Sequence, residues 1–262
     1  MRRRIITRRI IRLKLKRKMA VAILITVIAI AIYPVYDEII TSVQKITDAD
    51  ILFIDPGHGG IDGGAESAMG VSEKNINLAI ALQIKEFAEA DGWKVVMSRE
   101  EDKGLYDREK RAIRSLKTQD ILARKEMIQK TKPLVAVSIH LNSFKQDRSV
   151  RGAQTFYPQG NVDKLIQDES KKLAEIIQEQ LITDMADGTD RIALGKRDLL
   201  LFKNPIAPIV VVECGFLSNS EEAKLLEKRD YQKKLAQSIY RGILKYTGKE
   251  KKEFIQSIDS RG

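Results

Sequence analysis

Two histidines and a glutamate are the residues of this sequence best suited to chemistry, and each lies at or just after the end of an apolar run. The chain of 262 residues contains only two histidines, His58 and His140, and a third apolar run closes on Glu213. Zinc favours histidine nitrogen and carboxylate oxygen, and a catalytic zinc site typically uses three protein ligands with water at the fourth position. Two histidines and one glutamate complete such a set with no histidine to spare.

The apolar runs that precede these residues predict buried strands. Residues 51–55, 134–139 and 209–212 are short and show no alternation of apolar and polar positions. This pattern is typical of central strands in a parallel sheet that is covered on both faces. In such sheets ligands bind outside the carboxyl ends of the strands. We therefore expect the two histidines and the glutamate to gather at one edge of a sheet.

A second carboxylate, Glu73, competes with Glu213 for the metal, and counting ligands does not decide between them. Ser72 is the expected N-cap of a helix over 74–90, where an acidic first-turn residue is often only a partner of the helix dipole. The preceding loop, 56–70, contains six glycines, which let a backbone approach a ligand closely. It lacks the motifs of a phosphate-binding loop. The residues alone also leave open two ordinary strand-end histidines without a metal.

The rest of the pattern predicts one α/β domain over 51–247, with a mostly parallel central sheet of about six strands flanked by helices. Apolar periodicity predicts helices and strands that alternate along the chain. The mixed charge of 104–130 indicates one or two helices with a solvated face. The other expected segments are helices at 163–182, 220–227 and 230–246, strands at 93–97, 153–157 and 199–202, a flexible connection at 184–197 and a charged tail at 248–262.

The formal net charge of +10 is concentrated at the amino end. Ten of the 46 basic residues lie in 1–18, which leaves 36 basic against 36 acidic residues in the remainder. Nucleic-acid binding depends on clustered cations that neutralise phosphates. A body without net charge therefore argues against a nucleic-acid partner.

An uncharged stretch of eighteen residues, 19–36, follows this basic segment and reaches the lower limit for a membrane-spanning helix. The basic flank on one side and acidic residues on the other predict a cytoplasmic amino end and an extracytoplasmic body, joined by a linker over 37–50. The rival interpretation is a cleaved signal peptide, for which Ala29 and Ala31 offer a site. Either way the catalytic body is expected outside the cytoplasm.

The single cysteine, Cys214, rules out an internal disulfide. Its place beside Glu213 suggests a thiol nucleophile, but a small buried side chain at a strand end is the better interpretation. The domain is therefore expected to depend on its apolar core, and on a metal, for stability.

Several motifs resemble, in order and in strand context, the zinc-dependent N-acetylmuramoyl-L-alanine amidases (amidase 3 type). They are DPGHGG, Glu73 within SEKN, SIHLNS and VECGFLSN, and the resemblance covers about 51–246. The segment GAQTFY, the membrane-proximal start and the lack of a wall-binding repeat look most like the spore-cortex, germination-specific branch. The resemblance implies Zn²⁺ bound by His58, Glu73 and His140, with Glu213 as the catalytic carboxylate.

The implied activity is hydrolysis of the amide between the lactyl group of N-acetylmuramic acid and L-alanine in peptidoglycan, in spore cortex formation or modification. A noncatalytic peptidoglycan-binding or sensor protein, and a zinc peptidase that cuts within the stem peptide, are the alternatives. The expected partners are peptidoglycan and the membrane, with an unidentified accessory protein as a further candidate. For the spore-cortex branch, the expected location is the forespore intermembrane space.

Other polar residues are weaker candidates. Asn142 and Ser143 follow the second histidine closely enough to orient substrate, although a role in turn formation is equally expected. Lys203 lies where the resembling family often has a basic residue near the substrate. For Asp55 and Asp62 we expect loop capping in preference to support of a metal ligand.

Overall fold

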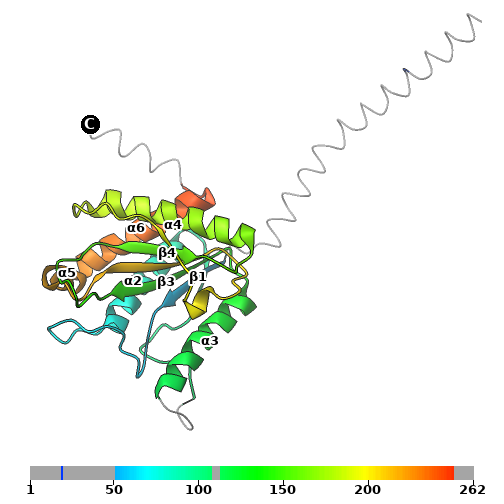
Figure 1. The fold of residues 1–262 in the computed structure, drawn as a ribbon. Coiled ribbons are helices and arrows are strands. Elements are labelled where there is room, and N and C mark those ends of the chain that lie inside the picture. Colours follow the sequence, from blue (N-terminus) through cyan, green and yellow to red (C-terminus); the bar gives the residue numbers. More distant parts are fainter. Residues whose placement is uncertain (1–18, 20–50, 108–112, 251–262) are drawn as a thin grey trace, which may run out of the picture. The chain divides into compact units, whose positions relative to one another are not determined.

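A six-stranded sheet forms the centre of the part of the chain that the computed structural model describes, residues 19, 51–107 and 113–250 (Figure 1). The strand order is β2-β1-β3-β6-β4-β5, and every neighbouring pair is parallel except β4 with β6. The prediction of a mostly parallel sheet of about six strands is confirmed. The strands are β1 (Ile51–Pro56), β2 (Lys94–Met97), β3 (Val135–Asn142), β4 (Gln154–Pro158), β5 (Leu194–Lys196) and β6 (Ile209–Phe216).

The register of the three central strands brings their carboxyl ends to one edge of the sheet. Asp55 of β1 lies opposite Ser138 of β3, and His140 of β3 lies opposite Glu213 of β6. The interiors of these strands are almost completely buried, as expected for strands covered on both faces. The second histidine and the glutamate are therefore cross-strand neighbours.

Helices cover both faces of the sheet, with α3 on the side opposite α4 and α6 (Figure 1). The larger core lies between the sheet and helices α2, α4 and α6, and the smaller core lies under α3 and the short 3₁₀ helix η2. Successive strand residues face opposite sides, so Leu52 enters the larger core and Phe53 the smaller. The helices are α2 (Glu73–Ala90), α3 (Ile113–Thr131), α4 (Lys164–Met185), η2 (Leu200–Phe202), α5 (Ser220–Leu226) and α6 (Arg229–Thr247).

The expected strand at 199–202 is wrong, because this segment forms η2. Leu201 and Phe202 are consecutive yet both enter the smaller core, which the alternation of a strand would prevent. The expected flexible connection over 184–197 contains the edge strand β5 instead. β5 is held by backbone pairing with β4 and has no buried side chain, so its sequence carries no apolar pattern.

The expected anchor at 19–36, apart from Met19, and the linker at 37–50 lie outside the described residues, as do 1–18 and the tail beyond residue 250. Residues 108–112, within the predicted helical segment, also lie outside them. Among the helices that the structure does describe, none combines the length and the apolar character needed to cross a membrane.

Candidate metal centre

The turn after β1 carries His58 in a left-handed backbone conformation, with φ of 61°. This conformation costs a non-glycine residue about 1 kcal/mol. Two buried arginines stabilise this conformation from outside the turn. Arg99 Nε donates to the His58 carbonyl over 2.7 Å, and Arg124 Nη2 donates to the same carbonyl over 2.6 Å. Only glycine fits at position 57, because a Cβ there would lie 2.2 Å from the ring of His140. The turn thus packs directly against the second histidine.

His58, Glu73 and His140 converge, although they come from the β1 turn, the first residue of α2 and the carboxyl part of β3. Each offers one ligand atom, and these atoms lie within 4.8 Å of one another. Glu73 Oε1 is 3.2 Å from His58 Nε2 and 3.0 Å from His140 Nδ1. The two rings meet edge to face with centroids 4.9 Å apart. Geometry therefore puts Glu73, and not Glu213, between the histidines.

Asp62 orients the first of these histidines. Its Oδ2 lies 2.8 Å from His58 Nδ1, so an ionised Asp62 accepts the Nδ1–H and leaves the Nε2 lone pair facing Glu73. Asp62 Oδ1 also accepts from the backbone N–H of Gly64 at 3.3 Å and pairs with Lys117 Nζ at 2.6 Å. The expected loop capping is present in the Gly64 contact, but the preference for it over support of a ligand is wrong, because Asp62 also contacts His58.

Glu73 is buried and held at both carboxylate oxygens. Oε2 accepts from the backbone N–H of Ala65 at 2.7 Å, and Oε1 accepts from that of Leu141 at 3.0 Å. Ser72 occupies the N-cap of α2 as predicted, but its hydroxyl donates to the Gly63 carbonyl at 2.7 Å and ties down the glycine loop. The glycine loop therefore encloses the glutamate from one side.

The electrostatics of this cluster favour a cation. Burial alone would raise the pKa of Glu73, but its hydrogen bonds to the two histidines outweigh this and lower the pKa. Burial would lower the pKa of His58, yet the carboxylates of Asp62 and Glu73 raise it to about 9. The site thus stabilises a positive charge between its carboxylates. Two imidazoles and one carboxylate fit a divalent ion such as zinc, which would replace the proton on His58 Nε2.

Glu213 lies beside this cluster, opposite His140 in the pairing of β3 with β6. Its Oε2 is buried and has no hydrogen-bond partner among the residues that the structure describes. Burial raises the pKa of Glu213, the charge of His140 opposes the rise and that of Glu73 adds to it. A carboxylate with a raised pKa and an unused oxygen is suited to accept and return a proton. Lys196 is a cation whose charge reaches Glu213, and sequence reasoning missed it because β5 was not expected.

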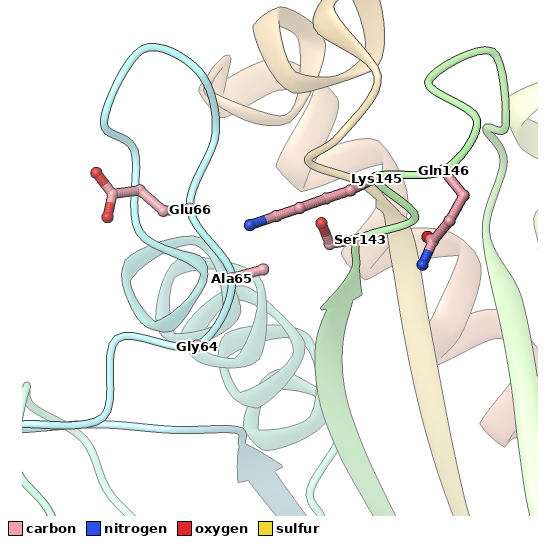
Figure 2. Close-up of a pocket in the computed structure, with 6 residues that line it drawn as sticks. All are labelled: Gly64, Ala65, Glu66, Ser143, Lys145 and Gln146. Carbon is pink, nitrogen blue, oxygen red and sulfur yellow. The ribbon is translucent and has the colours of Figure 1, made fainter.

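The three weaker candidates, Asn142, Ser143 and Lys203, lie in different surroundings. Asn142 Oδ1 accepts from the backbone N–H of Ser143 at 2.8 Å, which is a turn-forming contact. Ser143 lines a pocket of about 460 Å³, which Gly64 and Ala65 of the glycine loop line from the other side (Figure 2). Lys203 follows η2 and is exposed, and within the described residues no side-chain hydrogen bond or ion pair joins it to the cluster.

Asp55 and Cys214 are buried and stand apart from the metal ligands. Asp55 accepts from Ser98 and Ser138, each at 2.6 Å, and pairs with Arg124, so the expectation of loop capping is wrong. Burial alone would raise the pKa of Asp55, but these partners outweigh it and lower the pKa to about 2. Burial raises the pKa of Cys214, which supports its interpretation as an inert core residue.

The family model described as N-acetylmuramoyl-L-alanine amidase matches residues 52–245. The chain belongs to this family. The resemblance inferred from the motifs is confirmed, and the match spans the β1 turn, both histidines, Glu73 and Glu213.

Similar proteins include an amidase described as germination-specific. The germination-specific N-acetylmuramoyl-L-alanine amidase of Bacillus subtilis (strain 168) is 36% identical over 196 residues, which cover 75% of this chain and 79% of the relative. Among solved structures, the CwlD amidase from Clostridioides difficile in complex with the GerS lipoprotein is 40% identical with a TM-score of 0.72, covering 77% of this chain and 100% of that one. The amidase AmiC2 of Nostoc punctiforme is 27% identical with a TM-score of 0.62, covering 77% of this chain and 98% of its own.

Proposed function

We propose that this member of the amidase family is a zinc-dependent enzyme that cleaves the amide between the lactyl group of N-acetylmuramic acid and L-alanine in peptidoglycan. The observation that carries the proposal is the convergence of His58, Glu73 and His140, with ligand atoms within 4.8 Å of one another and Glu213 on the adjacent strand. The three converging residues would hold the ion. Zinc supplies Lewis acidity at such a site, which makes water more acidic and polarises a carbonyl group.

In this proposal Glu213 transfers the proton and Asp62 orients one of the ligands. Glu213 takes a proton from the attacking water, and the water oxygen forms a bond to the carbonyl carbon of the lactyl group. As the C–N bond breaks, Glu213 returns the proton to the nitrogen of L-alanine, so the products are a free carboxyl and a free amine. Asp62 keeps the His58 ring oriented throughout, through its contact with Nδ1.

We further propose a role in the spore cortex and an extracytoplasmic site of action. Similarity to the germination-specific amidase of Bacillus subtilis supports the first, and the basic and apolar segments at 1–18 and 19–36 support the second. The complex of the Clostridioides difficile relative with a lipoprotein supports a protein partner of that class. Cortex from spores that lack the gene should then contain fewer muramic acid residues without peptide, as measured by muropeptide mass. Unchanged cortex would remove the spore role while leaving the amidase proposal intact.

The purified full-length chain, loaded with zinc, should release stem peptides with a new L-alanine amino end from peptidoglycan, and a chelator should stop this release. Product mass separates the alternatives. A new amino end elsewhere in the stem would identify a peptidase. Binding to the wall without any zinc-dependent product would identify a noncatalytic binder or sensor.

A further inference from the structure

The pocket beside the metal centre has one cation, Lys145, and one anion, Glu66, among its lining residues. It is lined by Gly64, Ala65 and Glu66 on one side and by Ser143, Lys145 and Gln146 on the other, and its volume is about 460 Å³. Figure 2 shows the Lys145 side chain extended across the pocket toward the loop that carries Ala65. The Glu66 carboxylate points away from Lys145, and the Ser143 hydroxyl lies near the Lys145 stem (Figure 2).

Lys145 has no counter-charge within the ranges that the structure describes, 51–107 and 113–250. It is exposed, and no hydrogen bond or ion pair of its ammonium group occurs among the residues that the structure describes. Some exposed lysines pair with an acid, as Lys164 does with Asp168 at 2.6 Å, and others, such as Lys94, have no partner among the described residues. What distinguishes Lys145 is its place on the pocket. An unpaired ammonium that reaches over a pocket is a docking group for a carboxylate.

The pocket and the metal centre share a wall. The backbone N–H of Ala65 donates to Glu73 Oε2, and a Cβ on Gly64 would lie 2.4 Å from that oxygen and 2.8 Å from Cδ2 of His58. The Gly64–Ala65 segment therefore contacts the candidate ligands and also lines the pocket. Lys145 follows His140 by five residues, a separation that spans at most about 17 Å of chain.

We propose that this pocket binds the stem peptide through the free carboxylate of its second residue, with Lys145 as the counter-charge. This inference rests on the proposed function. In peptidoglycan, L-alanine is followed by D-glutamate linked through its γ-carboxyl, which leaves the α-carboxylate free within about 7 Å of the scissile bond. Lys145 is thus a specificity residue that distinguishes an α-carboxylate from an α-carboxamide at this position.

The test uses two substrates that differ only at this group: N-acetylmuramoyl-L-Ala-γ-D-Glu-L-Lys, and the same compound with the α-carboxyl of the second residue amidated. The zinc-loaded full-length chain should show a KM about threefold to tenfold lower for the carboxylate form. Lys145→Met should lose this preference with kcat changed by less than about twofold. The matched control is Lys94→Met, an exposed lysine on the edge strand β2, which should keep it. A preference that survives in Lys145→Met, or one absent from the wild type, overturns the proposal.

A binding measurement separates failure of this inference from failure of the proposed function. Both compounds are titrated calorimetrically into Glu213→Gln, with and without Lys145→Met in addition. If the wild type cleaves neither compound but Lys145 still determines which one binds, the subsite is retained and the amidase proposal fails. If the wild type cleaves both compounds equally and both bind equally, the amidase proposal is retained and the role of Lys145 is rejected.

Discussion

Arg124 in α3 donates from Nη2 to the main-chain carbonyl of His58 over 2.6 Å, so a helix on one face of the sheet holds the turn that presents a candidate metal ligand. Arg99 donates to the same carbonyl and also to that of Gly57. Both guanidinium groups are buried, and Asp55 and Asp120 balance the charge of Arg124. The position of the first histidine therefore depends on a buried charge network and not on the glycine loop alone.

Replacing Arg124 with Met should weaken both folding and metal binding. The change leaves Asp55 as a buried charge without its partner, which costs about 3 kcal/mol or more. It also frees the turn, so zinc affinity of the folded fraction should fall by at least about tenfold. Urea denaturation measures the first effect, and competition with a chromophoric chelator measures the second. Lys130→Met, at an exposed position of the same helix, should change neither quantity. Unchanged zinc affinity in folded Arg124→Met would show that the turn keeps its own shape.

Asp62→Asn should lower zinc affinity by about tenfold while leaving the fold intact. Asparagine keeps the size of the side chain but removes the negative charge that orients His58 and increases its basicity. Chelator competition provides the measurement. Asp147→Asn, in an exposed loop, serves as the matched control. Equal zinc affinity in the two variants would assign Asp62 to turn geometry only.

Glu213→Gln and Glu73→Gln form a matched pair that separates the base from the ligand. Glu213→Gln should keep zinc within about twofold and lose about 10²- to 10⁴-fold in kcat, because only proton transfer is removed. Glu73→Gln should lose zinc as well as activity, because Glu73 Oε1 lies between the two histidines. Metal content after gel filtration and turnover of a muramyl tripeptide give both readouts. Loss of zinc from Glu213→Gln would move that residue into the ligand set.

Asp55 should make stability depend on pH in the acid range. Its folded-state pKa of about 2 lies below the ordinary value of 3.8, so the unfolded chain takes up the proton more readily. The ionised carboxylate contributes fully above pH 3.8, and its contribution is lost as the pH falls through 2. The difference in unfolding free energy between wild type and Asp55→Asn should shrink by about 2 kcal/mol from about pH 5 to about pH 2.

A constant gap between wild type and Asp55→Asn would mean that Arg124 does not depress the Asp55 pKa.

The strand ends were readable from the sequence because burial on both faces leaves continuous apolar runs, and a polar residue after each run stands out. The choice between Glu73 and Glu213 was not readable from the residues alone. It depends on the path of the glycine loop, which brings the first turn of α2 back to the β1 turn, and only the family resemblance pointed to it.

The burial of Arg124 in α3 was not predicted from the sequence, for a different reason. α3 has mixed charge, so its sequence predicted a solvated face, yet Asp120 and Arg124 are both buried. Their burial is a tertiary effect that exists only once Asp55 and the carbonyls of the β1 turn lie opposite them. Lys145 was visible only as one of several cations in a polar loop, since the pocket that gives it a role is formed by two segments far apart in sequence.

The pairing of His140 with Glu213 across β3 and β6 also has a consequence for hydrogen exchange. Amides in the central strands of a sheet exchange only when the whole domain opens, whereas loops exchange through small local openings. The paired backbone amides of β3 and β6 should therefore be among the slowest to exchange deuterium, while the amides of 58–72 exchange sooner. The spacing of these two groups would then survive every local opening and be lost only with the native state itself.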